Sequence, residues 1–149
     1  MKIKKASIND NEILTEITKK SKAYWGYSEE QILKWNNNLT ISVAYIETNC
    51  VFTLVNDNKI IGYYSYIIKE EKNVILDNLF ILPEYIGKGF GKYLMNDFLN
   101  RMKTEKFEKI TLDSEPNAEN FYLKIGFKKI GEFETSIKNR FMPIMEINL

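Results

Sequence analysis

The chain has 149 residues, a length typical of one domain with a sizeable core. Its 21 Lys and Arg residues nearly balance 20 Asp and Glu residues, and a net charge of +1 gives no general attraction to nucleic acid or an anionic membrane. With no histidine and a single cysteine, Cys50, the sequence has no internal disulfide, argues against a structural zinc site and lacks Ser-His and Cys-His nucleophiles.

The first fifty residues predict an edge strand followed by short helices. Residues 2–6 read as the strand, and Asn9 or Asp10 can cap the first helix. Ser28 to Gln31 form a capping box for a second helix, and Ser42 can cap a short third one. The side chains expected to face inward from the first two helices are Ile13, Leu14, Ile17, Ile32, Leu33 and Trp35.

A hairpin and a strand covered on both faces follow. Residues 51–55 and 59–69 flank Asn56-Asp57-Asn58, a turn signal, and residues 70–73 lead into a strand over 74–82. That strand is apolar on both faces except at Asp77 and Asn78, which indicates that helices cover both sides.

The segment after this strand predicts an anion site. Pro83-Glu84-Tyr85-Ile86 runs into Gly87-Lys88-Gly89-Phe90-Gly91 and then an amphipathic helix. Alternate glycines at the start of a helix leave main-chain N–H groups accessible to a bulky anion such as a pyrophosphate. The side chains that recur on the helix's apolar face are Phe90, Leu94, Met95, Phe98, Leu99 and Met102.

Two other nucleotide-binding patterns fit this loop poorly. A Walker loop needs Gly-Lys followed by Ser or Thr and a longer gap between glycines, whereas Lys88 precedes Gly89. The dinucleotide fingerprint places its third glycine one position after Gly91 and usually opens a domain, although Asp113 could serve as its ribose-binding acid.

The last third predicts a strand over 109–113, a short helix from Asn117 that Gly126 ends, and strands over 128–134 and 141–147. The fold class is therefore α/β (α+β): a mixed, mostly antiparallel sheet of about six to seven strands with helices on both faces. We expect one domain over residues 1–149. A cytoplasmic location is expected, because the sequence shows no secretory segment and no run long enough to span a bilayer.

Two motifs together resemble the GNAT superfamily of acetyl-CoA-dependent N-acetyltransferases, of the small bacterial type. They are Pro-Glu-Tyr-x-Gly-Lys-Gly-x-Gly from Pro83 and Asn-Ala-x-x-Phe-Tyr-x-x-x-Gly-Phe from Asn117. The resemblance covers nearly the whole chain and implies two parallel strands that splay apart to admit the pantetheine arm. It departs at Ile86, where the family usually has Gln or Arg; this puts a side-chain contact in doubt, since main-chain groups bind most of the phosphate in this family.

The resemblance implies acetyl-CoA as co-substrate, with no metal. The diphosphate would lie on main-chain N–H groups, and the pantetheine would pair with the strand as an added strand does. One N–H of that strand would face the thioester oxygen as oxyanion donor. The cofactor-binding residues predicted are Leu79, Phe80, Ile81, Ile86, Gly87, Lys88, Gly89, Phe90, Gly91, Lys92, Asn117 and Tyr122. Asn117 has two readings, a pantetheine contact or a helix N-cap.

Two residues are candidates for proton transfer. By its place in the motif, Tyr122 would be the general acid that protonates the coenzyme A thiolate. Asp77 would act as base through water or hold the amine by charge; the alternative is a structural carboxylate bonded to neighbouring strands. Cys50 could carry the acetyl group but lacks a base.

The resemblance implies that one wall of the acceptor site lies between the first two helices. Tyr24, Trp25 and Tyr27 would form an aromatic wall for an alkyl or cationic amine, and Arg140, in a segment like a closing hairpin of related enzymes, would reach the acceptor or coenzyme. With Asp77, these complete the predicted substrate-binding set.

The leading hypothesis is acetyl transfer to a primary amine by direct attack in a ternary complex. A small molecule is expected as acceptor rather than a protein, because no acidic groove for a basic tail is visible; nucleic acid and membrane are not expected as partners. The protein would be a monomer or homodimer. The alternatives are a non-catalytic acyl-CoA sensor and a plain interaction domain.

Overall fold

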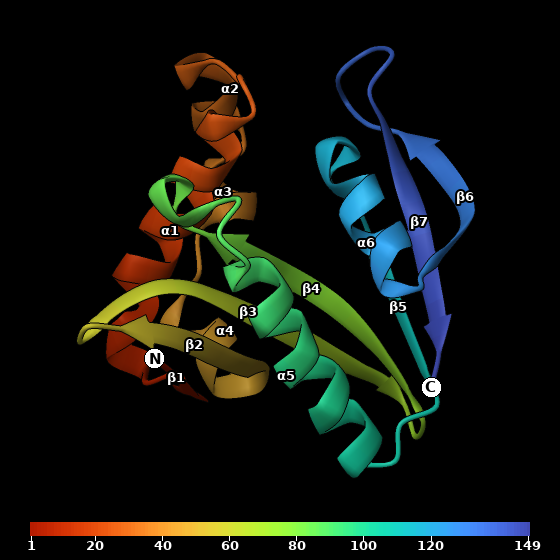
Figure 1. Ribbon diagram of the computed structural model, residues 1–149. Helices are drawn as coiled ribbons and strands as arrows, with labels where there is room; N and C mark the ends of the chain where they lie inside the picture. The colour runs from red at the N-terminus through yellow and green to blue at the C-terminus, as the bar shows by residue number, and fades with distance from the viewer. The chain divides into compact units, whose positions relative to one another are not determined.

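The computed structural model describes residues 1–149 and contains seven strands, six α-helices and three 3-10 turns (Figure 1). The strands are β1 (Lys2–Lys5), β2 (Cys50–Asn56), β3 (Lys59–Glu70), β4 (Asn73–Ile81), β5 (Lys109–Asp113), β6 (Lys128–Glu134) and β7 (Phe141–Asn148). The helices are α1 (Asn11–Tyr24), α2 (Glu29–Lys34), α3 (Asn36–Leu39), α4 (Val43–Thr48), α5 (Phe90–Thr104) and α6 (Glu119–Ile125). The 3-10 turns are η1 (Ile8–Asp10), η2 (Pro83–Tyr85) and η3 (Pro116–Ala118).

The strands form one hydrogen-bonded sheet in the order β1-β2-β3-β4-β5-β7-β6. The pairs β1–β2, β2–β3, β5–β7 and β6–β7 are antiparallel, and β4–β5 is parallel. This confirms the predicted mixed, mostly antiparallel sheet. The residues divide into two units, 1–66 with 78–100 and 67–77 with 101–149, and β3, β4 and α5 each contribute to both.

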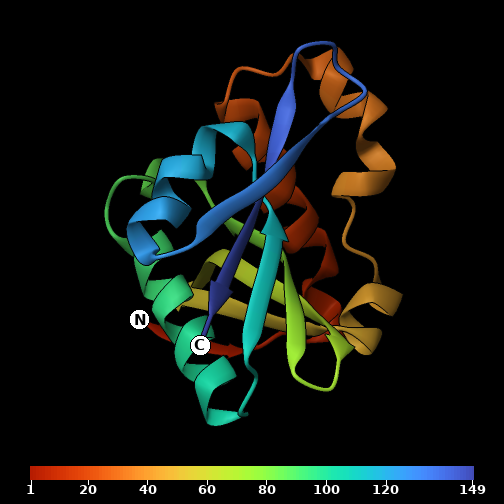
Figure 2. The same cartoon turned by 90° about the vertical axis from the view of Figure 1, so that its right-hand side faces the viewer.

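In the first unit, helices lie on both faces of β2 and β3. Tyr63 and Tyr64 are neighbours in β3 and therefore point to opposite faces. The Tyr63 hydroxyl hydrogen-bonds that of Thr18 in α1, whereas the Tyr64 hydroxyl donates to Asp97 of α5, with 2.7 Å between the oxygens. Figures 1 and 2 show α1 and α5 on opposite sides of these strands.

The apolar stripes of α1 and α5 fill this unit's core. Leu14 and Ile17 of α1 and Leu94, Met95 and Phe98 of α5 are fully buried, in agreement with the predicted helix faces. Burying one such side chain stabilises the fold by about 1.5–3 kcal/mol. The helices that flank the proposed site are thus held by packing.

The second unit builds its own core from α6 and the last strands. Ile110 of β5 and Met145 of β7 have no exposed surface, and Tyr122 of α6 and Phe127 are almost as deeply buried. The α6 helix ends at Gly126, whose φ of +121° suits a residue without a side chain. The predicted glycine stop is confirmed.

The structure corrects the predictions at the helix starts. Ser7, rather than Asn9 or Asp10, forms the capping box, on the 3-10 turn before α1. Asn117 is not an N-cap, because it lies inside η3 and α6 begins at Glu119 with Ala118 before it. Leu33 was expected in the core but is 73% exposed, since α2 ends within two turns and the chain re-enters a helix, α3, that the pattern did not predict.

Candidate functional site

The loop between β4 and α5 has the backbone that an anion cradle needs. Gly87 and Gly89 take φ values of +80° and +87°, the left-handed region that side chains rarely adopt. A Cβ added at either position would meet no atom within 4 Å, so both glycines face open space. A large anion can therefore approach this main chain without meeting a side chain.

The N–H groups of this loop are not equally available. Tyr93 makes the first bond of α5, its N–H donating to the Gly89 carbonyl at 3.0 Å, and the N–H groups of the preceding three helical residues have no acceptor one turn back. The Ile86 N–H donates instead to the Pro83 carbonyl at 3.2 Å. The Ile86 N–H is therefore less available to an anion than the N–H groups of the first turn of α5.

The lysines beside the cradle are exposed. The Lys88 ammonium lies 5.8 Å from the ring centroid of Tyr85, and that ring packs edge-on against Phe90. Lys92 is also exposed, on the first turn of α5. Both side chains can approach a bound phosphate, but in this structure Lys88 rests on an aromatic ring.

The parallel strands β4 and β5 stay paired only at their starts. Their register joins Asn73, Val74 and Ile75 to the three residues from Lys109. β4 continues to Ile81 and β5 to Asp113 beyond the paired part. The splayed pair of strands that the family resemblance implies stays a prediction.

Tyr122 has a buried ring and an accessible hydroxyl. Its ring packs edge-on against Phe121 and Phe127, at centroid distances of 5.2 and 5.6 Å. The hydroxyl makes no hydrogen bond within the chain, and every fully buried side-chain oxygen has a partner, so the hydroxyl must lie in the 7% of the residue that solvent reaches. Burial raises the pKa of the Tyr122 phenol well above its ordinary value of 10.0, which keeps it protonated at neutral pH.

Asp77 has an acidic neighbour that the sequence analysis did not single out for this role. Burial, with the charge of Asp77 adding to it, raises the pKa of Asp113. Asp113 ends β5, the parallel partner of β4, and both carboxylates are exposed. Equal offsets from the last paired residues, Ile75 and Thr111, could have revealed the pair once the strands were known to be parallel.

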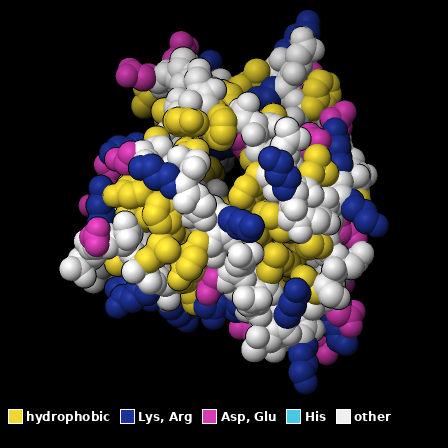
Figure 3. Space-filling view, in the orientation of Figure 1, with side chains coloured by type: hydrophobic (Ala, Val, Ile, Leu, Met, Phe, Trp, Pro, Cys, Tyr) yellow, Lys and Arg dark blue, Asp and Glu magenta, His cyan; other side chains and the backbone are white.

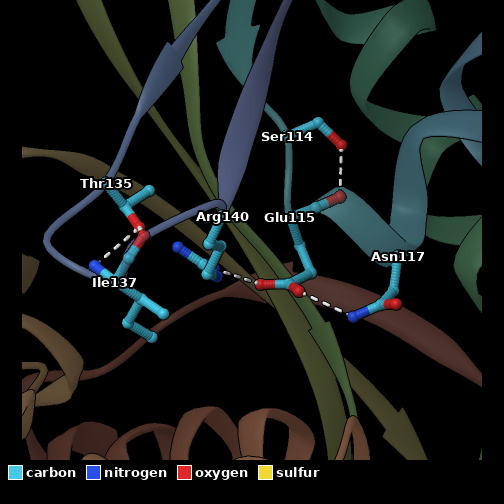
Figure 4. Close-up of polar contacts among 6 residues, drawn as sticks. All are labelled: Ser114, Glu115, Asn117, Thr135, Ile137 and Arg140. Atoms are coloured by element: carbon cyan, nitrogen blue, oxygen red, sulfur yellow. Dashed lines mark hydrogen bonds and ion pairs between the residues drawn. The ribbon is translucent and has the colours of Figure 1, made fainter.

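Arg140 lies in an ion pair (Figure 4). Its guanidinium is 2.9 Å from Glu115, and the two side chains are only 11% and 10% exposed. The other Glu115 oxygen accepts from the Asn117 amide at 2.9 Å. Two predicted site residues therefore meet at Glu115, which the sequence analysis missed because nothing in a pattern marks a pair 25 residues apart.

The three aromatic residues predicted to line the acceptor site do not form one continuous surface; Tyr24 and Trp25 contact each other, and Tyr27 contacts Trp35. Tyr24 and Trp25 contact each other edge-on and are 51% and 39% exposed. Tyr27 instead packs on Trp35, with ring centroids 5.0 Å apart, and the Lys22 ammonium lies 5.8 Å from the Trp35 centroid. Trp35 was predicted to face the core from the second helix, but its ring contacts Tyr27 instead.

Three further observations concern possible metal ligands, surface charge and helix length. No group of three or more His, Cys, Asp or Glu residues is arranged to hold a metal ion. On the face shown in Figure 3, basic and acidic side chains are intermixed. None of the helices has the length and apolar character needed to cross a membrane.

Comparisons with known proteins agree with this geometry. The family described as "Acetyltransferase (GNAT) domain" matches residues 26–148. The structure is similar to that of the PaiA N-acetyltransferase from Thermoplasma acidophilum in complex with coenzyme A. The TM-score is 0.83 and the identity 26%, over 99% of this chain and 98% of that one.

The relatives matched by sequence are similar to a shorter part of this chain. The [ribosomal protein bS18]-alanine N-acetyltransferase of Haemophilus influenzae is 34% identical over 80 residues, covering 52% of this chain and 53% of that protein. The uncharacterised N-acetyltransferase ycf52 of Porphyra purpurea is 25% identical over 93 residues, or 60% of this chain and 53% of that protein. The chain spans about half the length of the curated relatives it matches.

Proposed function

Because the chain belongs to the GNAT family of acetyltransferases, we propose that it transfers an acetyl group from acetyl-CoA to a primary amine of a small molecule. The amine would attack the thioester directly in a ternary complex, with no acetylated enzyme. A cytoplasmic protein, either monomer or homodimer, that binds neither nucleic acid nor membrane is part of this proposal.

The observation that carries the proposal is the open glycine loop before α5. Gly87 and Gly89 have positive φ values and free space where side chains would lie, and the unbonded N–H groups of the first turn follow at once. Residues from Gly87 through Lys92 would bind the diphosphate with main-chain donors, aided by the helix dipole. The Ile86 N–H would contribute less, since it is already bonded to Pro83.

The remaining roles follow the chemistry of acetyl transfer. The main chain of Leu79, Phe80 and Ile81 would pair with the pantetheine, and one N–H there would stabilise the oxyanion. Tyr122 would protonate the leaving thiolate, a role that its accessible hydroxyl supports. The raised pKa keeps the phenol protonated but also makes it a weaker acid. Asp77 would accept the amine proton through water.

The acceptor would bind beside the aromatic segment after α1. Tyr24, Trp25 and Tyr27 offer ring surface to an alkyl amine, and Tyr24 and Trp25 are exposed enough to do so. Arg140 would act there through its contact with Glu115, because the guanidinium is already committed to that carboxylate.

A second acceptor class has one observation in its favour. The Haemophilus influenzae relative acts, by its name, on an alanine of a ribosomal protein, and it matches half of this chain at 34% identity. A peptide α-amine would then replace the small amine, with the same donor chemistry. A panel that includes polyamines, amino acids and an alanine-ended peptide separates the two, with release of free thiol as readout.

The central test separates binding from turnover. Acetyl-CoA should raise the melting temperature, and Tyr122→Phe should lower kcat on the order of 100-fold while the dissociation constant for acetyl-CoA stays within about threefold of wild type. A matched control is Tyr93→Phe, at an exposed position on α5. Binding of acetyl-CoA without turnover of any amine would favour the non-catalytic acyl-CoA sensor. The absence of a thermal shift at millimolar acetyl-CoA would contradict both the acetyltransferase and the sensor hypotheses.

A further inference from the structure

The Lys22 ammonium, near the end of α1, lies beside two aromatic rings. Its nitrogen is 5.8 Å from the ring centroid of Trp35 and 5.9 Å from that of Phe80. Both distances fall within the roughly 6 Å over which a ring face attracts a cation. Trp35 lies between α2 and α3, and Phe80 belongs to β4, so two separate segments of the first unit contribute to one ammonium position.

Each of these two rings packs against a tyrosine. The Trp35 ring meets Tyr27 edge-on, with centroids 5.0 Å apart, and the Phe80 ring lies 6.0 Å from that of Tyr63. Tyr63 has no exposed surface, and its hydroxyl is hydrogen-bonded to that of Thr18. The rings are therefore in place before a ligand arrives, which lowers the cost of ordering them on binding.

The ammonium and the rings are not sealed in the core. Lys22, Trp35 and Phe80 are each half-buried. A lysine ammonium is strongly hydrated and stands on a long, flexible stem, so the Lys22 ammonium can leave the rings for water while its main chain stays in α1. The ring faces can thus exchange one cation for another.

This position adjoins the strand that would bind acetyl-CoA. Ser21 of α1 is 3% exposed, and its hydroxyl donates to the Ile81 carbonyl at 2.6 Å, which attaches the last turn of the helix to the end of β4. Phe80 precedes Ile81 in the segment whose main chain would pair with the pantetheine. Tyr27, which packs on the other ring, belongs to the proposed acceptor wall. The two rings therefore connect the proposed acceptor wall to the proposed donor strand.

The chemistry of the reaction decides which group a cation site would bind. An alkyl amine has a pKa of about 10.4 and is protonated at neutral pH, but the amine that attacks the thioester must be neutral. A group that stays on the ring faces as a cation is thus not the attacking amine. It would be a second charged group of the same molecule.

We propose that the rings of Trp35 and Phe80 form a subsite for a second, positively charged group of the acceptor, and that the Lys22 ammonium occupies this subsite until the acceptor displaces it. This inference rests on the proposed function and narrows the acceptor to a diamine or polyamine. Lys22 would be an internal competitor that raises the KM for such an acceptor and takes no part in acetyl transfer.

The test compares putrescine with butylamine, which have the same alkyl chain and differ by the second amine. Lys22→Ala vacates the rings, so the KM for putrescine should fall about three- to tenfold while that for butylamine changes less than about twofold. The control is Lys20→Ala, which removes the same charge from an exposed ammonium bonded to Glu16 and should leave both KM values as in wild type. An unchanged KM for putrescine in Lys22→Ala overturns the proposal.

A double variant separates the rings from the charge. Loss of electrostatic repulsion would also favour putrescine in Lys22→Ala, but repulsion does not depend on an aromatic ring. Lys22→Ala combined with Trp35→Leu should therefore lose the gain in KM, and Phe80→Leu replaces Trp35→Leu if that variant does not fold. A gain that persists in the double variant would mean that Lys22 only repels cations, which also overturns the subsite.

Failure of the proposed function would look different. Calorimetric titration with putrescine needs no acetyl transfer, and Lys22→Ala should bind putrescine about three- to tenfold more tightly than wild type does. Tighter binding by a protein that acetylates no amine would refute the proposed function and keep the subsite. Acetylation of both amines, with equal putrescine affinity in wild type and Lys22→Ala, would refute the subsite and keep the proposed function.

Discussion

The segments that follow β4 and β5 begin alike and end differently. Each strand leads into a 3-10 turn that starts with proline, Pro83 in η2 and Pro116 in η3. After η2, glycines open the main chain towards solvent, and the nearby lysines are exposed. At η3, side chains bond one another, with Glu115 joined to both Asn117 and Arg140.

The difference shows two ways to build a functional surface on the same starting geometry. The loop after η2 needs residues without side chains, because Gly87 and Gly89 have positive φ values that other residues rarely adopt. The turn at η3 depends on charged side chains that are almost completely withdrawn from water. The first should therefore be sensitive to added atoms, and the second to removed ones.

The largest effect is expected from breaking the pair at η3. Arg140→Met leaves Glu115 charged and 90% buried without its guanidinium, and should lower the free energy of unfolding by about 3 kcal/mol. Replacing both partners, Arg140→Met with Glu115→Met, should recover most of this loss, because no charge is then left buried. Urea denaturation of the two variants and wild type measures both effects.

A double variant no more stable than Arg140→Met alone would contradict this account of the pair. Lys129→Met is the matched control, since its bridge to Glu132 is solvent-exposed on both sides and should contribute little.

The next effect is expected at the cradle. Gly89→Val places a β-branched side chain at a φ of +87°, which costs about 1–3 kcal/mol in backbone strain or flattens the loop. We expect the dissociation constant for acetyl-CoA to rise by about 30-fold, the equivalent of about 2 kcal/mol. Isothermal titration calorimetry measures this directly.

Side-chain changes in the same loop provide the contrast. Ile86→Gln and Lys88→Met keep every main-chain donor and should alter that dissociation constant by less than about threefold, because a solvated lysine near a phosphate contributes little. If Lys88→Met weakened binding more than Gly89→Val, the cradle would depend on side-chain charge and the comparison with η3 would fail.

The sequence was informative where local rules decide the outcome. Strands β5 and β6 have the predicted bounds, and the apolar repeat of α5 gave its buried residues, because period and turn chemistry act within a few residues. The alternate glycines identified the loop for the same reason. The Arg140–Glu115 pair and the contacts of Lys22 with Trp35 and Phe80 were not predictable, since each depends on segments brought together only by the finished fold.

The smallest effect concerns the acidic end of β5. Because the pKa of Asp113 is raised in the folded protein, first by burial and then by Asp77, its ionised form is disfavoured there relative to the unfolded chain. Asp113→Asn should therefore increase stability at pH 7, by less than about 1 kcal/mol since the group is largely solvent-screened. As the pH falls through the raised pKa towards the ordinary value of 3.8, wild-type Asp113 takes up its proton, and the advantage of the variant should disappear.

Urea denaturation at pH 7 and near pH 4 tests this, with Asp57→Asn in the β2–β3 turn as control. A constant difference between Asp113→Asn and wild type at both pH values would show that the amide acts through packing rather than charge. In that case the charge of Asp113 would not limit the stability of the folded protein at pH 7. A difference that vanishes in acid would support the view that burial, with the charge of Asp77 adding to it, disfavours the ionised form of Asp113 in the folded protein.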